Sequence, residues 1–282
     1  MTDCESAPPT ATGERTPGQT QTRYEVHDGA AWITLDRGEA RNALSATLVG
    51  ELFDHTARAL EDDAVRCLVI TGAGAAFCAG ADLKNPPGRP GEGGRPYADL
   101  LRTLWHSPKP VIAAVNGSAF AGGLGLVGAA DVVVAAETAI FCFSEVRVGV
   151  IPAIISVVCL PKLGAHHAMR LFLGGHRFDA REAVAVGLAH RAVPMEQLPS
   201  AVAEEVDAIR LGGPEAVAEC KRLVRAIDRL DLDRAFEIAS EWSRLRFEST
   251  EAAEGMAAFR EKRPPRWAKR DGPAKGDGAG EP

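Results

Sequence analysis

Two loops of small residues, each following a short apolar run, constrain the fold of this chain more than any other feature. The first loop, residues 71–82, follows Cys67-Leu-Val-Ile70. The second begins at Asn116 and ends at Gly125, after Val111-Ile-Ala-Ala-Val115. Both runs have the composition of buried strands, and the loops contain glycines that let the backbone approach a ligand closely. Two such loops predict paired backbone N–H groups that converge on one oxygen, as in an oxyanion hole.

The order of secondary-structure patterns predicts an α/β fold with substantial parallel pairing. Asp28-Gly29 lies between two apolar runs and predicts a hairpin, and Ser45 has the side chain and position of a helix N-cap. Further strands are expected over Val132–Ala135 and Ile140–Phe143. From about Pro194 the pattern turns helical, with helices expected over Leu198–Ile209, Pro214–Ile227, Leu232–Phe247 and Glu251–Phe259.

Composition narrows the class of protein. The chain is 46% hydrophobic and 25% charged, as in globular proteins, and its net charge of −6 gives no reason to expect nucleic-acid binding. Residues 1–22 and 268–282 are predicted to be disordered tails, and no apolar run reaches membrane-spanning length. The six cysteines are scattered without a C-x-x-C pair, which indicates free thiols and no metal site. We therefore expect a cytoplasmic protein that does not contact a membrane.

Three further segments form a recognisable pattern together with the two loops: Asp36–Leu44, Phe141–Pro152 and Phe259–Trp267. Together with the loops, these segments resemble the enoyl-CoA hydratase/isomerase (crotonase) family in the expected order. The resemblance implies a crotonase (ClpP/crotonase-like) fold, in which a core over residues 23–200 is a spiral of β-β-α units. It also implies that a C-terminal helical region, residues 201–267, covers the core and builds a homotrimer, often stacked as a homohexamer.

The same resemblance implies an enzyme that acts on an acyl-CoA substrate and uses no cofactor or metal. The N–H groups of Ala81 and Gly122 would hold the thioester carbonyl, and Glu145 would be the catalytic acid–base group. Five residues are implied as contacts of the CoA moiety: Arg41, Ala79, Asp82, Leu83 and Lys262. For Arg41 and Lys262, plain solvated charge is the alternative interpretation.

The residues around Glu145 also indicate a catalytic role for it. It follows an apolar run and lies in an otherwise apolar stretch, so partial burial would raise its pKa toward a useful range for proton transfer. The alternative is an ion pair with Arg147 or Arg170.

Gly125 is the main departure from the family pattern, because typical hydratases carry a second glutamate at this place. With one carboxylate, the chain hydrates a 2-enoyl-CoA by Glu145 alone, isomerises a 3-enoyl-CoA, or binds acyl-CoA with weak turnover. Similar glycine-containing relatives described as hydratases favour hydration. A glycine here is also expected to leave room for branched or bulky acyl chains.

Other motifs allow competing hypotheses. Gly123-Leu-Gly-Leu-Val-Gly128 matches the dinucleotide fingerprint, but it starts too far from the preceding strand, so we interpret its glycines as helix-packing positions. Cys78 has no base placed beside it for a role as nucleophile. His166 and His167 are expected to be ordinary helix or surface residues. The Pro- and Gly-rich stretch of residues 84–96 is either a wall over a pocket or a surface insertion.

Overall fold

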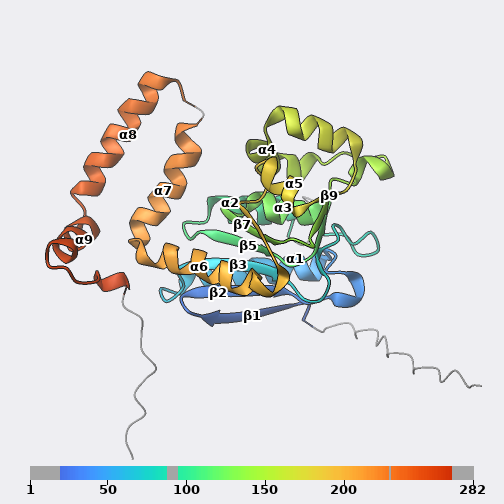
Figure 1. The fold of residues 1–282 in the computed structure, drawn as a ribbon, viewed down its shortest axis with the longest axis horizontal. Helices are drawn as coiled ribbons and strands as arrows, with labels where there is room; N and C mark the ends of the chain where they lie inside the picture. The colour runs from blue at the N-terminus through green and yellow to red at the C-terminus, as the bar shows by residue number, and fades with distance from the viewer. Residues whose placement is uncertain (1–19, 88–94, 229, 269–282) are drawn as a thin grey trace, which may run out of the picture.

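A computed structural model of the chain describes residues 20–87, 95–228 and 230–268 (Figure 1). It begins with the predicted hairpin, in which β1 (Thr22–His27) pairs antiparallel with β2 (Ala30–Leu35). Asp28 and Gly29 both adopt positive φ, at 51° and 76°, as a two-residue hairpin turn requires. The predicted tails fall almost entirely outside the described residues, and β1 already begins at Thr22.

Two sheets form the centre of the molecule. The larger has the strand order β1-β2-β3-β5-β7-β10, and the smaller has the order β4-β6-β8-β9. The strands after the hairpin are β3 (Cys67–Gly72), β4 (Ala76–Cys78), β5 (Val111–Val115), β6 (Ser118–Phe120), β7 (Val132–Ala136), β8 (Ile140–Cys142), β9 (Phe178–Asp179) and β10 (Arg191–Val193). Strands β2, β3, β5, β7 and β10 run parallel, and the apolar, largely buried runs of β3, β5 and β7 are typical of parallel strands.

A repeating unit of two strands and a helix builds these sheets. The strands β3, β5 and β7 lie in the larger sheet, and each is followed at once by a partner in the smaller sheet, namely β4, β6 and β8. A helix follows each pair: α2 (Tyr97–His106), α3 (Gly122–Ala129) and α4 (Ala153–Gly174), the last after the short 3-10 helix η2 (Glu145–Val148). This is the predicted spiral of β-β-α units, and the β3–β4 and β5–β6 loops contact each other, because Asn116 Nδ2 donates to Gly74 O at 2.9 Å.

The remaining elements complete the core. Helix α1 (Ala46–Glu61) begins at the predicted cap, where Ser45 Oγ accepts a hydrogen bond from Leu48 N at 3.1 Å. Helix α4 contains Pro161 and is kinked at Gly164. The other elements are η1 (Gly38–Ala40), α5 (Ala180–Ala185), η3 (Met195–Gln197), α6 (Leu198–Leu211), α7 (Pro214–Ile227), α8 (Leu232–Phe247), α9 (Thr250–Arg260) and η4 (Arg266–Ala268).

Helices α7, α8 and α9 stand away from the sheets, whereas α6 lies against them (Figure 1). Leu198, Val202 and Val206 of α6 pack in a buried cluster with strand residues of the larger sheet. The division predicted after residue 200 therefore passes through α6. Helix α7 is tied to the core by Asp131, which pairs with Lys221 at 2.7 Å and Arg225 at 2.6 Å.

Candidate active site

A short ladder of hydrogen bonds joins the 41–44 segment to the first glycine loop. Ala79 N donates to Arg41 O at 3.0 Å, Leu44 N to Gly80 O at 2.7 Å, and Asp82 N to Leu44 O at 2.9 Å. Ala81 lies within this ladder, between the bonded residues Gly80 and Asp82. Among the described residues, no hydrogen bond uses the Ala81 N–H.

The second glycine loop brings Gly122 against Ala81. A Cβ atom placed on Gly122 would lie 3.6 Å from Ala81 N and 2.9 Å from Leu44 Cδ1, and one placed on Gly80 would lie 3.4 Å from Gly122 N. Gly122 is the first residue of α3, so its N–H has no partner within the helix and lies at the positive end of the helix dipole. The two unbonded amides therefore lie side by side.

The backbone on either side of these amides is held in unusual conformations. Gly80 has a φ of 96°, and Ala121, directly before Gly122, has φ 45° and ψ −118°. Ala121 N donates to Cys142 O at 2.9 Å, which anchors this conformation to β8. A non-glycine residue at positive φ is costly, by about 1–3 kcal/mol, and such outliers cluster at functional sites.

A cavity of about 550 Å³ opens beside Ala81. Five residues predicted from the sequence as site residues line it: Arg41, Ala79, Ala81, Asp82 and Leu83. Arg41 is exposed, and the Leu83 side chain is 85% exposed, so both project into solvent at the mouth of the cavity.

Lys262 is not brought to this cavity. It is exposed and lies two residues after the end of α9, which is far from α1 in Figure 1, whereas Arg41 and its neighbours precede α1. Within one chain, Lys262 and Arg41 therefore do not share a site.

The Asp82 carboxylate is occupied by the protein itself. It is 9% exposed, pairs with Arg37 at 2.7 Å, and accepts hydrogen bonds from Lys84 N and Asn85 N. Burial raises the pKa of Asp82, but the Arg37 guanidinium and the two amides outweigh it, so the net pKa is lowered. Asp82 thus organises the loop.

Asn42 is a buried residue that was not predicted as part of the site. It adopts positive φ, its Oδ1 accepts from Arg37 N at 2.8 Å, and its Nδ2 donates to Ala73 O and Ala76 O at 3.0 and 2.7 Å. These bonds fix the first glycine loop against the 37–44 segment. In the sequence, Asn42 is a single asparagine directly after Arg41. Asparagine is common in turns, so its presence there does not indicate a site residue.

Glu145 lies at the same end of the smaller sheet as Gly122. Phe120 of β6 pairs with Cys142 of β8, so residues 121–122 and 143–145 leave the sheet together. Oε2 of Glu145 is buried and accepts no hydrogen bond from the described residues. Burial raises the pKa of Glu145.

The alternative ion pairs of Glu145 are not formed. Arg170 binds Glu182, and Arg147 donates to Gly174 O at 3.0 Å.

The glycines of α3 are packing positions, as predicted. A Cβ on Gly123 would lie 2.5 Å from Cys78 O, and one on Gly128 would lie 2.7 Å from Cys159 Sγ.

The expectation that Gly125 opens space for bulky acyl chains is wrong. A Cβ there would lie 2.6 Å from Tyr97 Oη, 2.8 Å from Ile155 Cγ2 and 3.0 Å from Leu101 Cδ1, so the volume is already filled.

The other candidates do not join this site. Burial raises the pKa of Cys78 to about 12, which leaves it a thiol at neutral pH. His166 and His167 lie on α4 with their rings edge to face. Of the Pro- and Gly-rich stretch, residues 88–94 lie outside the described residues, and Lys84 and Asn85 line the cavity beside Ala81.

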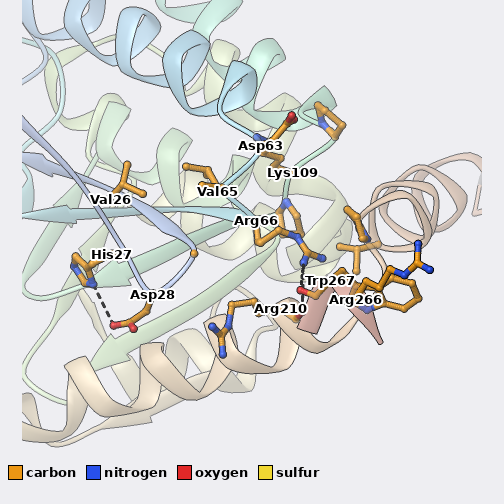
Figure 2. Close-up of a pocket in the computed structure, with 16 residues that line it drawn as sticks. Val26, His27, Asp28, Asp63, Val65, Arg66, Lys109, Arg210, Arg266 and Trp267 are labelled. Atoms are coloured by element: carbon orange, nitrogen blue, oxygen red, sulfur yellow. Dashed lines mark hydrogen bonds and ion pairs between the residues drawn. The ribbon is translucent and has the colours of Figure 1, made fainter. Parts of the chain in front are cut away.

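A second cavity, of about 740 Å³, lies where the C-terminal segment meets the β1–β2 hairpin (Figure 2). Arg66 Nη2 donates to Gly212 O at 2.6 Å, and its Nη1 donates to Trp267 O at 3.3 Å. These bonds tie η4 and the end of α6 to the core. None of the predicted site residues lines this cavity, so we assign it no part in catalysis.

The described residues show neither a metal site nor a membrane-spanning helix. No group of three or more His, Cys, Asp or Glu side chains there has the arrangement of a metal site. None of the helices there is both long and apolar enough to span a bilayer.

Comparison with known proteins gives one consistent answer. Residues 25–270 match the family model described as enoyl-CoA hydratase/isomerase. The carnitinyl-CoA dehydratase of Proteus mirabilis is 36% identical over 83% of this chain and 93% of its own length. The enoyl-CoA hydratase EchA19 of Mycobacterium tuberculosis is 37% identical over 84% and 92%.

Solved structures agree with the sequence relatives. An enoyl-CoA hydratase/isomerase from Marinobacter aquaeolei superposes with a TM-score of 0.81 at 32% identity, covering 88% of this chain and 99% of that one. AtuE from Pseudomonas aeruginosa gives a TM-score of 0.81 at 34% identity, covering 88% and 100%. The chain has the crotonase fold and belongs to the enoyl-CoA hydratase/isomerase family.

Proposed function

We propose that this protein hydrates a 2-enoyl-CoA to a 3-hydroxyacyl-CoA through a thioester enolate. The observation that carries the proposal is the pair of unbonded amides, Ala81 N–H and Gly122 N–H, which lie side by side at the start of α3. Both would donate to the thioester oxygen, on which negative charge develops as the enolate forms. A donor of this kind typically stabilises the transition state by about 2.7–4 kcal/mol.

In this proposal Glu145 acts first as a general base and then as a general acid. Its buried, unbonded Oε2 accepts a proton from water while the water oxygen bonds to the β-carbon of the enoyl group. The resulting carboxylic acid then returns a proton to the α-carbon, and the enolate collapses to the thioester. A pKa raised by burial suits this cycle, because Glu145 must both accept and release a proton.

Isomerisation of a 3-enoyl-CoA is the second candidate, and the single carboxylate favours it. Gly125 supplies no acidic group, and one base is sufficient to move a proton between the α- and γ-carbons. Loss of turnover with retained acyl-CoA binding is a third outcome. The relatives named as hydratases and dehydratases support hydration, because dehydration is the same reaction in reverse.

The cavity beside Ala81 would hold the CoA moiety. Arg41 would pair with a CoA phosphate, the Ala79 carbonyl would accept from the adenine amino group, and the exposed Leu83 side chain would cover the nucleotide. Asp82 would act by holding the loop in place, because Arg37 already occupies its carboxylate. Lys262 would reach CoA only from a neighbouring copy of the chain.

Assembly into a trimer or a hexamer is part of the same proposal. Helices α7 to α9 expose apolar side chains that no described segment covers, including Val224, Leu232, Phe236, Phe247 and Phe259, which are 66–86% exposed. Burial of such side chains between subunits would stabilise an assembly and could bring Lys262 of one subunit to the CoA site of another.

Product analysis by mass spectrometry and NMR, with matched 2-enoyl-CoA and 3-enoyl-CoA substrates, tests the reaction. We expect water addition to the 2-enoyl-CoA, and we expect Glu145→Gln to lose most of the turnover while acyl-CoA binding survives. Glu196→Gln, which changes an exposed glutamate of η3, is the matched control. Near-normal kcat in Glu145→Gln would refute the assignment of the base, and conversion of the 3-enoyl-CoA alone would identify an isomerase.

A further inference from the structure

Tyr97 is one of two tyrosines in the chain, and its hydroxyl group contacts Gly122, a residue of the proposed active site. The residue is 8% exposed and is the first residue of α2. Its Oη donates a hydrogen bond to Gly122 O at 2.5 Å, so it contacts the residue whose N–H is the proposed oxyanion donor. Neither its type nor its position in the sequence indicated this contact.

The same hydroxyl occupies the place of a side chain at position 125. A Cβ on Gly125 would lie 2.6 Å from Tyr97 Oη, closer than real Cβ contacts. A phenol at this point and a side chain at position 125 therefore exclude each other. The glycine that removes a carboxylate from the site is the same glycine that admits the tyrosine hydroxyl.

Tyr97 and Glu145 share one poorly solvated region. Burial raises the pKa of Tyr97 well above its usual range. The nearby Cys78, Cys159 and Glu145 raise it further, and the Leu126 backbone amide opposes them. Tyr97 thus stays protonated at neutral pH, while Oε2 of Glu145 has no partner among the described residues. The tyrosine has a single proton, and Gly122 O accepts it, so the tyrosine oxygen can only accept a hydrogen bond from any further partner.

We propose that Tyr97 is a catalytic residue that accepts a hydrogen bond from the attacking water, whose other hydrogen bonds to Glu145. This inference rests on the proposed hydration. A water molecule has two hydrogens, and holding both fixes the direction of an oxygen lone pair toward the β-carbon. Tyr97 would thus supply the second acceptor that the site lacks at position 125.

The proton balance leaves Tyr97 unchanged. The water O–H bond facing Glu145 breaks as the bond between oxygen and the β-carbon forms, and that proton passes through Glu145 to the α-carbon. The hydrogen held by Tyr97 stays on oxygen and becomes the hydroxyl hydrogen of the product. Tyr97 keeps its own proton throughout, so exchange of the α-proton, which involves no water addition, does not require its oxygen.

The test compares two reactions in Tyr97→Phe, which keeps the ring and removes the oxygen. One is hydration of a 2-enoyl-CoA, and the other is Glu145-dependent exchange of the α-proton of a saturated acyl-CoA in D₂O, followed by mass spectrometry. We expect kcat for hydration to fall about tenfold, as for the loss of one hydrogen bond, while KM and the exchange rate stay within twofold. Tyr24→Phe, at the other tyrosine of the chain on β1, is the control.

The outcomes separate this inference from the proposed function. Equal losses of hydration and exchange in Tyr97→Phe would mean that Tyr97 acts through the fold or through Gly122, and would overturn the inference alone. Unchanged hydration would overturn it as well. If the wild-type protein hydrates none of the enoyl-CoA substrates, the proposed function and the inference both fail. Melting temperatures of the variants show whether each remains folded.

Discussion

Replacing Gly125 by alanine tests whether the space at this position is filled. A Cβ there would lie within 3.0 Å of three side chains, from Tyr97, Ile155 and Leu101. Gly50 of α1 is a matched control, because it is also a helical glycine and a Cβ there meets nothing within 4 Å. The two substitutions therefore share the change in helix propensity and differ in the space available.

The magnitude follows from these two effects. Alanine in place of a helical glycine stabilises by roughly 0.5–1 kcal/mol, and we expect Gly50→Ala to show this gain. Inserting a methyl group into a filled core typically costs about 1–3 kcal/mol. Gly125→Ala should therefore be less stable than Gly50→Ala by about 1–3 kcal/mol, and on balance less stable than the wild-type protein.

Urea denaturation at one fixed protein concentration measures this difference, because assembly makes apparent stability depend on concentration. The same alanine introduced into Tyr97→Phe should cost less, by about 0.5 kcal/mol or more, because the nearest atom, Tyr97 Oη, is gone. If Gly125→Ala is as stabilising as Gly50→Ala, the space is open, and the argument that Tyr97 fills it is wrong.

The remaining predictions concern charge. Asp131→Asn should destabilise the protein by about 3 kcal/mol in urea denaturation, because it leaves the half-buried Lys221 and Arg225 without their carboxylate. Arg41→Ala should raise KM for the acyl-CoA with kcat nearly unchanged in steady-state kinetics, as expected for a group that binds substrate and transition state equally. Glu145→Gln should raise the stability at pH 7. The folded-state pKa of Glu145 is raised, so the wild-type protein loses stability as pH rises through that pKa, and the advantage of the variant should vanish below about pH 4.3 in thermal melts.

Elements with strong local signals were predictable from the sequence. The Asp28-Gly29 turn and the Ser45 cap act through nearest neighbours, and the long parallel strands are continuous apolar runs. The three-residue strands β4 and β6 were not predicted, because Ala76-Phe-Cys78 and Ser118-Ala-Phe120 are too short to show a period. They exist because each strand pairs across the smaller sheet, and pairing between distant segments is not encoded locally.

One long helix, α4, was not predicted as a single element, because its local signals conflict. Helix α4 contains Pro161 and bends at Gly164, and both residues ordinarily indicate a helix end. It is retained because apolar residues on both sides of the bend, among them Ile155, Val158 and Leu171, are buried in the core.

The candidate site was predictable only in part for a related reason. The resemblance identified the loops around Ala81 and Gly122, and the structure places their amides side by side. A glycine in a sequence does not show whether the space beside it is open or filled, so Gly125 was interpreted as room for substrate. Tyr97 is 28 positions away in the sequence, and the fold alone brings its hydroxyl to that space.

Replacing a carboxylate with a phenol changes the electrostatics of the site as well as its shape. Two carboxylates in one poorly solvated pocket repel each other and push their pKa values apart. Here the pKa of Glu145 is raised by burial, and no second carboxylate contributes to the shift. The pKa of Tyr97 is also raised by burial, so the phenol is neutral throughout the pH range in which Glu145 changes from acid to carboxylate. A hydratase built in this way would therefore depend on a single ionisation, with activity falling at low pH as Glu145 is protonated, and with the tyrosine adding a hydrogen-bond acceptor without adding charge.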